Sequence, residues 1–472
     1  MRATSRTEAP ERPSAQIWSA VAALCLIQFI DVMGVTVVVT ALPKMLTDVR
    51  ASSADSSLVA TGYAMFFGGL LMFGARLGDR FGHRRTIVIS LGVFGVGALL
   101  GSTATSIVSL TGARCIQGAG AAGAVPCALT LLTSLAGSGR ARARAVAAWS
   151  AAGAAAGASG FVVGGVVTDV ASWRLIFWGL LAVSVVQTVA VIALVAPDSQ
   201  PRDARTLNLI GSTLLTALVM LVVVGATLLG QPGFRIVGAV MLVAAAPVAG
   251  LFVLAEHRAP APLLPRRVRR NPHVFRGTTG AFLNTAATSS TATLITLYLQ
   301  STLRRTPLAA AATLLPFSIL VIAGSVAAAR LLSRQLRERV TAAGLGLIGT
   351  GIAMPLLKPT SAIVVGSAMA VAGFGIGLSS VATTSLATDV PEPSRATASG
   401  IVNTGAQLGT AIGTALLLLL AAITTGVPAM TTGAPVIAWA TAAIIALTAA
   451  AAFARLPRTA ASEDQVVRPQ SC

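Results

Sequence analysis

Charged residues are scarce in this 472-residue sequence, and acids are scarcer than bases. Only 10% of the residues are charged, with 15 acids against 34 lysines and arginines. Hydrophobic residues make up 55% of the chain, and the mean hydropathy is +0.82. A soluble globular protein carries about 25% charged residues. The composition therefore excludes a soluble protein and predicts an integral membrane protein.

Cysteine is also rare, which excludes a disulfide-stabilised scaffold. The chain has four cysteines. Cys25, Cys115 and Cys127 lie in long apolar runs, and Cys472 is the last residue. A disulfide framework needs many cysteines in a short chain. We therefore assign no disulfide, no metal site and no chemistry to these residues.

Two further absences limit the possible energy sources and binding partners of the protein. No GxxxxGK[ST] phosphate-binding pattern occurs, and no polar stretch is large enough for a nucleotide-binding domain, so we expect neither ATP nor another cofactor. The formal net charge of +19 would suit a nucleic-acid-binding protein. However, the basic residues lie between the apolar runs, mostly on one predicted side. We therefore expect no nucleic-acid partner.

Long apolar runs fill most of the chain. They extend over about 18 to 25 residues, which suits helices across a hydrocarbon core of ~30 Å and is too long and continuous for barrel strands. The predicted fold class is an all-α membrane protein. Fourteen transmembrane spans are expected near residues 18–42, 58–76, 86–103, 108–135, 145–167, 175–196, 207–229, 235–255, 274–301, 309–331, 340–357, 361–386, 398–423 and 433–455.

The basic residues predict which ends of these spans face the cytoplasm. With the N-terminus inside, 26 of the 34 lysines and arginines fall in inside segments and 7 in outside loops. Cytoplasmic loops carry such an excess. Both termini are therefore expected in the cytoplasm, and the protein in the cytoplasmic (inner) membrane. Trp18, Trp173 and Trp178 fall at predicted span ends, where we expect them to anchor in the headgroup region.

One acid, Asp31, falls well inside a predicted span. An acid at mid-membrane costs about 2.5 to 3.5 kcal/mol on insertion scales, so it normally faces a cavity or a partner and indicates a functional site. Arg114 is the only base inside a predicted span, and helical spacing places it on one face with Gln117. From the outer helix ends, Asp31 lies about 16 Å deep and Arg114 about 9 Å. A long arginine side chain can bridge that offset.

A glycine- and arginine-rich loop follows the second predicted span. Its sequence, GARLGDRFGHRR over residues 74–85, closely resembles the signature between helices 2 and 3 of the major facilitator superfamily. The glycines permit a tight turn, and Asp79 can form a charge network with the arginines. The resemblance implies a cytoplasmic gate that takes part in conformational switching. Its residues are Gly74, Asp79, Arg80, Gly82, Arg84 and Arg85.

Two later stretches resemble motifs of the same family. Residues 114–122, RCIQGAGAA, are similar to the fourth-helix motif, whose arginine is associated with proton coupling. Residues 156–165, AGASGFVVGG, resemble the antiporter motif of exporters, with Ala156 and Phe161 in place of its usual first Gly and Pro. The alternative for this run is a packing helix with no bearing on transport direction. The antiporter-motif packing residues are Gly160, Gly164 and Gly165.

The run SWRLIF at 172–177 and the stretches 373–377 and 398–409 resemble the fourteen-helix drug:proton antiporter branch of the superfamily, the EmrB/QacA type. The resemblance implies two six-helix bundles related by pseudo-symmetry, with two helices inserted between them. The expected domains are a cytoplasmic N-terminal tail (1–17), an N-terminal bundle (18–196), two additional helices (197–255), a basic cytoplasmic linker (256–273), a C-terminal bundle (274–455) and a cytoplasmic C-terminal tail (456–472).

In this family the first and fourth helices line the central cavity, so Asp31 and Arg114 are expected to pair and to carry proton coupling. Burial disfavours an ionised carboxyl group and a nearby arginine favours it, so the balance can change as the two bundles rock. The alternative is a static ion pair that only fixes packing. The branch's usual first-helix acid would fall at Gly34, one helical turn from Asp31.

Polar residues of the cavity-lining spans are the expected substrate contacts, namely Gln28, Gln117, Asn284 and Thr288. The predicted function is proton-coupled efflux of amphipathic small molecules, such as antibiotics, drugs or secondary metabolites, by alternating access. The protein is expected to be a secondary active transporter and not an enzyme, with substrate, protons and the lipid bilayer as its partners. Two alternatives stay open: a proton-coupled importer of a small metabolite, and a non-transporting membrane sensor or scaffold.

Overall fold

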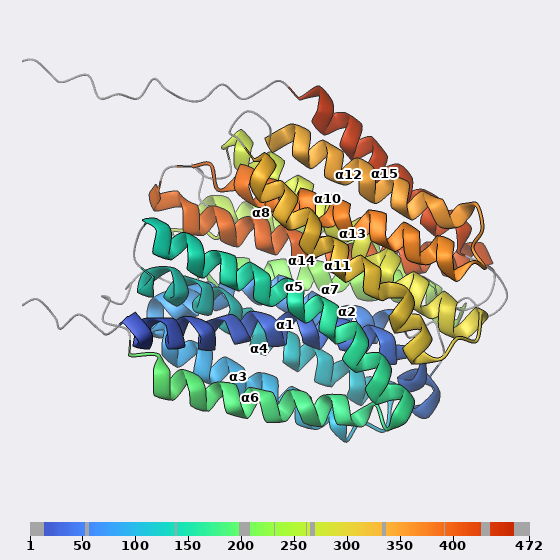
Figure 1. Cartoon of the computed structure of the whole chain (residues 1–472), viewed down its shortest axis with the longest axis horizontal. Helices are drawn as coiled ribbons and strands as arrows, with labels where there is room; N and C mark the ends of the chain where they lie inside the picture. Colours follow the sequence, from blue (N-terminus) through green and yellow to red (C-terminus); the bar gives the residue numbers. More distant parts are fainter. Residues whose placement is uncertain are drawn as a thin grey trace, which may run out of the picture.

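Long helices that run side by side make up the computed structural model (Figure 1). In the described part of the chain there is no strand, so the predicted all-α class is confirmed. The structure describes residues 14–51, 56–136, 139–197, 208–230, 232–260, 262–264, 270–332, 337–390, 392–425 and 435–456. Both predicted tails lie almost entirely outside these residues, as do Arg266, Arg267 and Arg269 of the basic linker.

The helices fall into two groups and an inserted pair. The first half consists of α1 (Ser14–Asp48), α2 (Ser56–Phe81), α3 (His83–Ser102), α4 (Ile107–Leu135), α5 (Gly139–Val170) and α6 (Arg174–Leu194). The inserted pair is α7 (Leu209–Leu229) and α8 (Arg235–Arg258). The second half consists of α10 (Pro272–Leu297), α11 (Pro307–Leu331), α12 (Arg337–Ala353), α13 (Ala362–Ala387), α14 (Glu392–Thr425) and α15 (Val436–Arg455). Short helical turns occupy Pro232–Phe234, Tyr298–Thr302 and Met354–Leu356.

The same helix pairings recur in the two halves. In the first half α1 packs against α5, α2 and α3 pack against α4, and α3 packs against α6. In the second half α10 packs against α14, α11 and α12 against α13, and α12 against α15. Contacts of α5 with α11 and of α2 with α14 join the halves. Within the inserted pair α7 contacts α8, and α7 also lies against α2 and α14.

Thirteen helices of the described residues are long and apolar enough to cross a membrane. The helix that does not meet this criterion is α10, in which 9 of 26 residues are Thr or Ser. The predicted count of fourteen spans therefore stays a prediction. Several helices are longer than their predicted spans, and α1 reaches Asp48 where the apolar pattern ends near residue 42. Helices can extend beyond the hydrocarbon core into the headgroup region.

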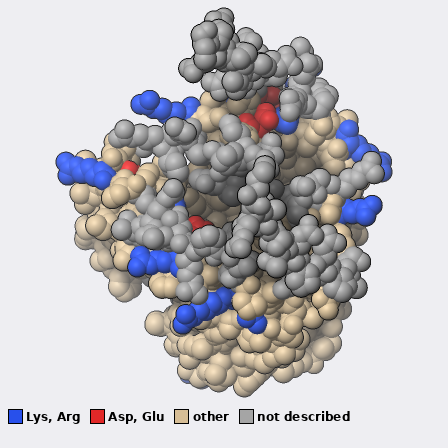
Figure 2. All heavy atoms as spheres, turned by 90° about the vertical axis from the view of Figure 1, so that its left-hand side faces the viewer, with Lys and Arg blue, Asp and Glu red and all other residues tan. Residues whose placement is uncertain are grey.

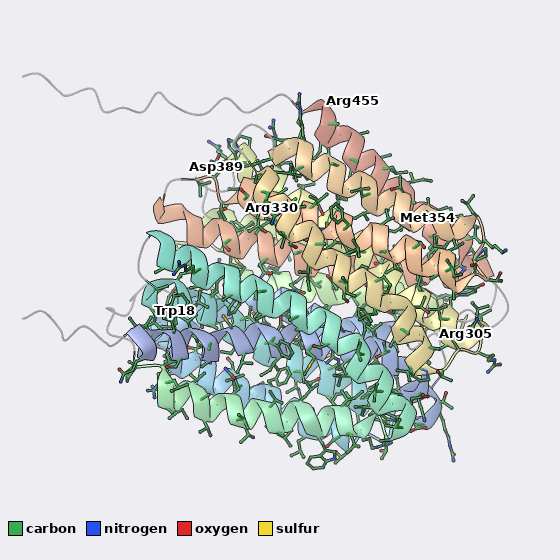
Figure 3. All side chains as sticks on the ribbon, viewed as in Figure 1. Trp18, Arg305, Arg330, Met354, Asp389 and Arg455 are labelled. Carbon is green, nitrogen blue, oxygen red and sulfur yellow. The ribbon has the colours of Figure 1, made fainter. Side chains whose placement is uncertain are left out.

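The start of α1 and the end of α15 lie toward the same end of the bundle, the left in Figure 1, which we name the termini end. Figure 3 places Trp18, Asp389 and Arg455 toward this end and Arg305 toward the opposite end. Figure 2 looks onto the termini end and shows lysine and arginine side chains spread around its rim. This distribution is the feature on which the predicted cytoplasmic orientation depends.

Candidate functional site

Asp31 lies inside the first half of the molecule. It sits on α1 with only 5% of its surface exposed. A small pocket beside it is lined by Ile27 and Ile30 of α1, Leu91 and Phe94 of α3, and Ala121, Ala124 and Val125 of α4. The acid therefore points among the helices of its own half, where apolar side chains surround it.

Tyr63 of α2 is the partner of Asp31, and it was not among the predicted site residues. The Tyr63 hydroxyl donates a hydrogen bond to Oδ1 of Asp31. Its ring lies under the guanidinium of Arg114, with Cζ 4.6 Å from the ring centroid, in a cation–π contact. One signal was available: Tyr63 is one of only two tyrosines and falls inside a predicted span. A buried phenol usually requires a hydrogen-bond partner.

Arg114 reaches the acid through this tyrosine and not directly. It is 1% exposed, and among the described residues no carboxylate lies within 4.0 Å of its guanidinium. The expected direct pair of Asp31 and Arg114 is therefore replaced by a three-residue cluster with Tyr63 in the middle. Nη1 of Arg114 donates to Oε1 of Gln117, 2.9 Å away. We name Asp31, Tyr63, Arg114 and Gln117 the buried polar cluster.

The two glutamines that were predicted to contact substrate lie in different surroundings. Gln117 is fully buried on α4 beside Gly97 of α3, where a Cβ on the glycine would lie 2.8 Å from Cγ of Gln117. The glutamine thus faces α3 and Arg114, inside the first half. Gln28 is half-buried and lies against Gly153 of α5. Its role as a substrate contact stays a prediction.

The substrate contacts predicted in the second half, Asn284 and Thr288, lie among uncharged polar residues between α10 and its neighbouring helices. We name this group the neutral polar seam. Asn284 donates from Nδ2 to Oγ of Ser380 on α13 over 2.9 Å. Thr288 bonds back to the Asn284 carbonyl at 2.7 Å. Thr285 donates across to the Ala406 carbonyl of α14 at 2.6 Å. The Asn284 and Thr285 bonds hold α10 against α13 and α14, while Oδ1 of Asn284 is buried with no hydrogen-bond partner among the described residues.

Residues 74–85 form the end of α2 and the start of α3 rather than the expected loop, and two of their glycines meet strict geometric demands. Gly82 is the single residue between α2 and α3, and its φ of 98° lies in the region that favours glycine. Gly74 lies so close to the Ala122 carbonyl of α4 that a Cβ would overlap it. The glycines therefore allow α2 to pack tightly on α4 and to reverse direction within one residue.

The charged residues of this stretch do not form the expected network between Asp79 and the arginines. The Asp79 carboxylate lies 3.7 Å from His83 rather than against Arg80 or Arg85. Arg84 donates to the Ile192 carbonyl at the end of α6, 2.6 Å away. The Arg80 guanidinium lies 5.7 Å from the ring centroid of Phe81. The stretch thus binds α6 through Arg84, while Asp79 pairs within its own turn.

The glycines of the antiporter-like motif form close helix contacts. Gly160 and Gly164 face Thr36 and Thr40 of α1, where an added Cβ would overlap both threonine hydroxyls. Gly165 faces α11, and a Cβ there would lie 2.6 Å from Cβ of Ala311. The small-residue face is thus present, and it connects α5 to α1 within the first half and to α11 in the second.

One of the three expected tryptophan anchors is buried. Trp173 is 0% exposed, and its Nε1 donates to Oδ2 of Asp48 at 2.7 Å. Arg174 lies over the Trp173 ring and 3.5 Å from the same carboxylate. Trp173 therefore braces α1 against α6 at the opposite end and is no anchor, because its indole N–H is satisfied inside the protein. Trp18 and Trp178 are exposed.

Comparison with known proteins identifies the family. The family model described as Major Facilitator Superfamily matches residues 24–414. The cephamycin export protein CmcT of Amycolatopsis lactamdurans is 32% identical over 427 residues, which are 89% of this chain and 87% of that protein. The puromycin resistance protein pur8 of Streptomyces alboniger is 31% identical over 428 residues, 86% of this chain and 82% of that protein.

A solved structure agrees on the fold. The human organic anion transporter MFSD10 (TETRAN) superposes with a TM-score of 0.66 at 15% identity, over 94% of this chain and 100% of that one. Together with the helical architecture, these matches lead to one assignment. The chain belongs to the Major Facilitator Superfamily and is a multi-pass membrane transporter.

Proposed function

We propose that this protein exports antibiotics or related secondary metabolites across the cytoplasmic membrane, in exchange for protons, with both termini in the cytoplasm. The direction and the substrate class rest on relatives that are a cephamycin export protein and a puromycin resistance protein, aligned over more than four-fifths of the chain. The orientation rests on the sequence count of lysines and arginines, 26 in the predicted inside segments against 7 in the outside loops. The proton gradient supplies the energy, without ATP or another cofactor.

The buried polar cluster is the observation that best supports proton coupling. Asp31 lies in the middle of a membrane helix, whereas the other buried acids of the described residues, Glu256 and Glu338, lie at helix ends. Burial disfavours the ionised carboxylate, while the Tyr63 hydroxyl and the Arg114 cation favour it. Two opposing influences of this kind let a small change in hydration decide whether the proton is bound.

The transport cycle follows from this balance. When the cavity opens outward, Asp31 takes up a proton and loses its charge, so the Tyr63 hydrogen bond and the attraction of Arg114 weaken. The three side chains come from α1, α2 and α4, so protonation changes how these helices hold together. When the cavity opens inward the proton leaves, and substrate moves in the opposite sense. Alternating access then repeats the exchange.

Proton movement in inverted membrane vesicles tests the proposal. Puromycin or a cephamycin is added to vesicles that hold a preformed proton gradient, and the internal pH is recorded. Wild-type protein should release protons from the vesicles on addition of a transported compound. Asp31→Asn should abolish that release, because the amide cannot bind and release a proton in this range.

Asp48→Asn is the matched control, since Asp48 lies on the same helix at the opposite end. It should retain substrate-induced proton release. Full proton release by Asp31→Asn would remove Asp31 from the mechanism. Accumulation of the compound by intact cells would show import and overturn export.

A further inference from the structure

Glu256 is a buried acid that the transport cycle above does not use. It lies in the last turn of α8, 5% exposed. Its Oε1 accepts hydrogen bonds from Nδ2 of Asn208 at 2.6 Å and from the Leu263 backbone N–H at 3.0 Å. Its Oε2 accepts from the Leu264 N–H at 2.8 Å. The carboxylate therefore ties together the start of α7, the end of α8 and the chain that follows α8.

The start of α7 is shaped to receive this carboxylate. Asn208 caps α7 by accepting from the Gly211 N–H through its Oδ1, which leaves its amide N–H free to donate to Glu256. Gly211 lies beside both side chains, and a Cβ there would be 2.8 Å from Oε1 of Glu256. A side chain larger than glycine at 211 would displace the carboxylate. The inserted pair thus holds Glu256 in a fixed position.

Residues 262–264, which we name the strap, reach from Glu256 to both halves of the transporter. The Pro262 carbonyl accepts a hydrogen bond from Nη2 of Arg76, at the end of α2 in the first half, over 3.2 Å. Leu264 packs against an apolar cluster of Val274, Val390, Ala398 and Ile401 in the second half, together with Met72 of α2. The strap therefore lies across the termini end, where it contacts the α2 and α14 sides of the joint between the halves.

We propose that the inserted pair works as a clasp for the termini end: Glu256 holds the strap in place, and the strap joins Arg76 of the first half to the apolar cluster of the second. The two halves must separate at this end whenever the cavity opens toward it. Separation requires the strap to release either Arg76 or its apolar contacts. The energy of the Glu256 bonds thus sets the balance between the closed and open states. The inference does not depend on which ion or substrate is carried.

Pulsed electron paramagnetic resonance on spin-labelled protein in lipid nanodiscs measures that balance. Labels are attached at Leu194 of α6 and Leu331 of α11, two exposed positions at the termini end on opposite halves, after the native cysteines are replaced by alanine. A second pair, Val170 of α5 and Leu357, reports on the opposite end. No proton gradient or substrate is present, so the result stands apart from transport.

Glu256→Gln is the main variant, because glutamine keeps the shape but offers only one acceptor oxygen to the strap amides. We expect the ratio of open to closed populations at the termini end to rise roughly fivefold, with the opposite end closing in step. Asn208→Ser retains the helix cap and removes the amide donor, so it should shift the ratio in the same direction by a smaller factor. Thr306→Ser, which alters the cap of α11 at the opposite end of the molecule, should change nothing.

Unchanged distance distributions in both Glu256→Gln and Asn208→Ser would overturn the clasp. If Glu256→Gln does not fold, Asn208→Ser decides alone. The measurement is repeated with Asp31→Asn in the background. The same shift there would show that the clasp acts even where proton coupling is lost, so failure of one proposal is distinguishable from failure of the other.

Discussion

The two halves share one helix arrangement but differ in the polarity of their buried interiors. In the first half the interior holds an acid, a phenol and a guanidinium in one chain of contacts. In the second half the corresponding helices α10 and α13 meet through Asn284 and Ser380, which carry no charge. The charge pairs of the second half, Arg276 with Glu338 and Arg337 with Asp389, lie near helix ends. A titrating site in the membrane interior needs an acid with tuning partners away from the helix ends, and among the described residues the first-half cluster combines both.

The largest expected effect comes from moving the acid between the halves. The double variant Asp31→Asn with Asn284→Asp places a carboxylate on α10, where the neighbouring side chain is the uncharged Ser380 of α13. We expect proton release to stay on the order of 100-fold below wild type, since proton transfer depends on a tuned group. Vesicle proton flux measures this. Recovery of coupling would show that the second half supports a titrating acid as well as the first.

Replacing the buried cation has the next largest effect. Arg114→Gln removes the charge that favours ionised Asp31, and we expect a loss of about tenfold or more in substrate-induced proton release. Arg114→Lys keeps the charge but cannot lie flat on the Tyr63 ring and donate to Gln117 together, so it should recover only part of the activity. Full activity of the glutamine variant would show that Arg114 has only a packing role.

Tyr63→Phe removes a single oxygen atom from the buried polar cluster. The ring stays under Arg114, but the carboxylate loses its hydrogen-bond donor, so the proton-bound form of Asp31 gains in relative stability. The pH at which proton-driven transport is half-maximal should therefore move upward by about one unit. A pH series of uptake into inverted vesicles provides the measurement. A lower maximum rate with an unmoved pH profile would indicate a structural role alone.

The smallest effect on proton release is expected for a substitution in the neutral polar seam of the second half. Ser380→Ala removes the partner of Asn284, and interhelical hydrogen bonds in membranes contribute about 0.6 kcal/mol on average. The variant should unfold slightly earlier on heating, while substrate-induced proton release stays at the wild-type level. A large loss of proton release would mean that Asn284 belongs to the coupling machinery and that the two interiors differ less than their charges suggest.

Local patterns predicted much of what the structure contains. Hydropathy placed the helices, because only a continuous helix can satisfy its backbone in a hydrocarbon core. Helical spacing correctly placed Gln117 beside Arg114, and the turn at Gly82 follows from its glycine. Helix ends were less accurate, since α1 extends past the apolar run.

Contacts between segments far apart in the sequence could not be predicted from local patterns. Tyr63 lies 32 residues from Asp31, and nothing local in the sequence indicates that these two helix faces meet. Trp173 resembled an interfacial anchor because its position at a span end is visible in the sequence, whereas its bond to Asp48 is not. Asp79 is a different case, because its partner His83 is only four residues away and not an arginine, so this local pairing was within reach of the sequence.

The sequence by itself determined that this protein is an all-helical membrane transporter with one acid deep inside a span. Hydrophobicity and the cost of a buried charge are properties of each segment, so they need no knowledge of its neighbours. Only the tertiary structure decided that Tyr63 stands between Asp31 and Arg114, and that Glu256 holds the strap across the termini end. Hydrogen bonds act over about 3 Å, so which groups they join depends on how the helices are rotated and packed against one another.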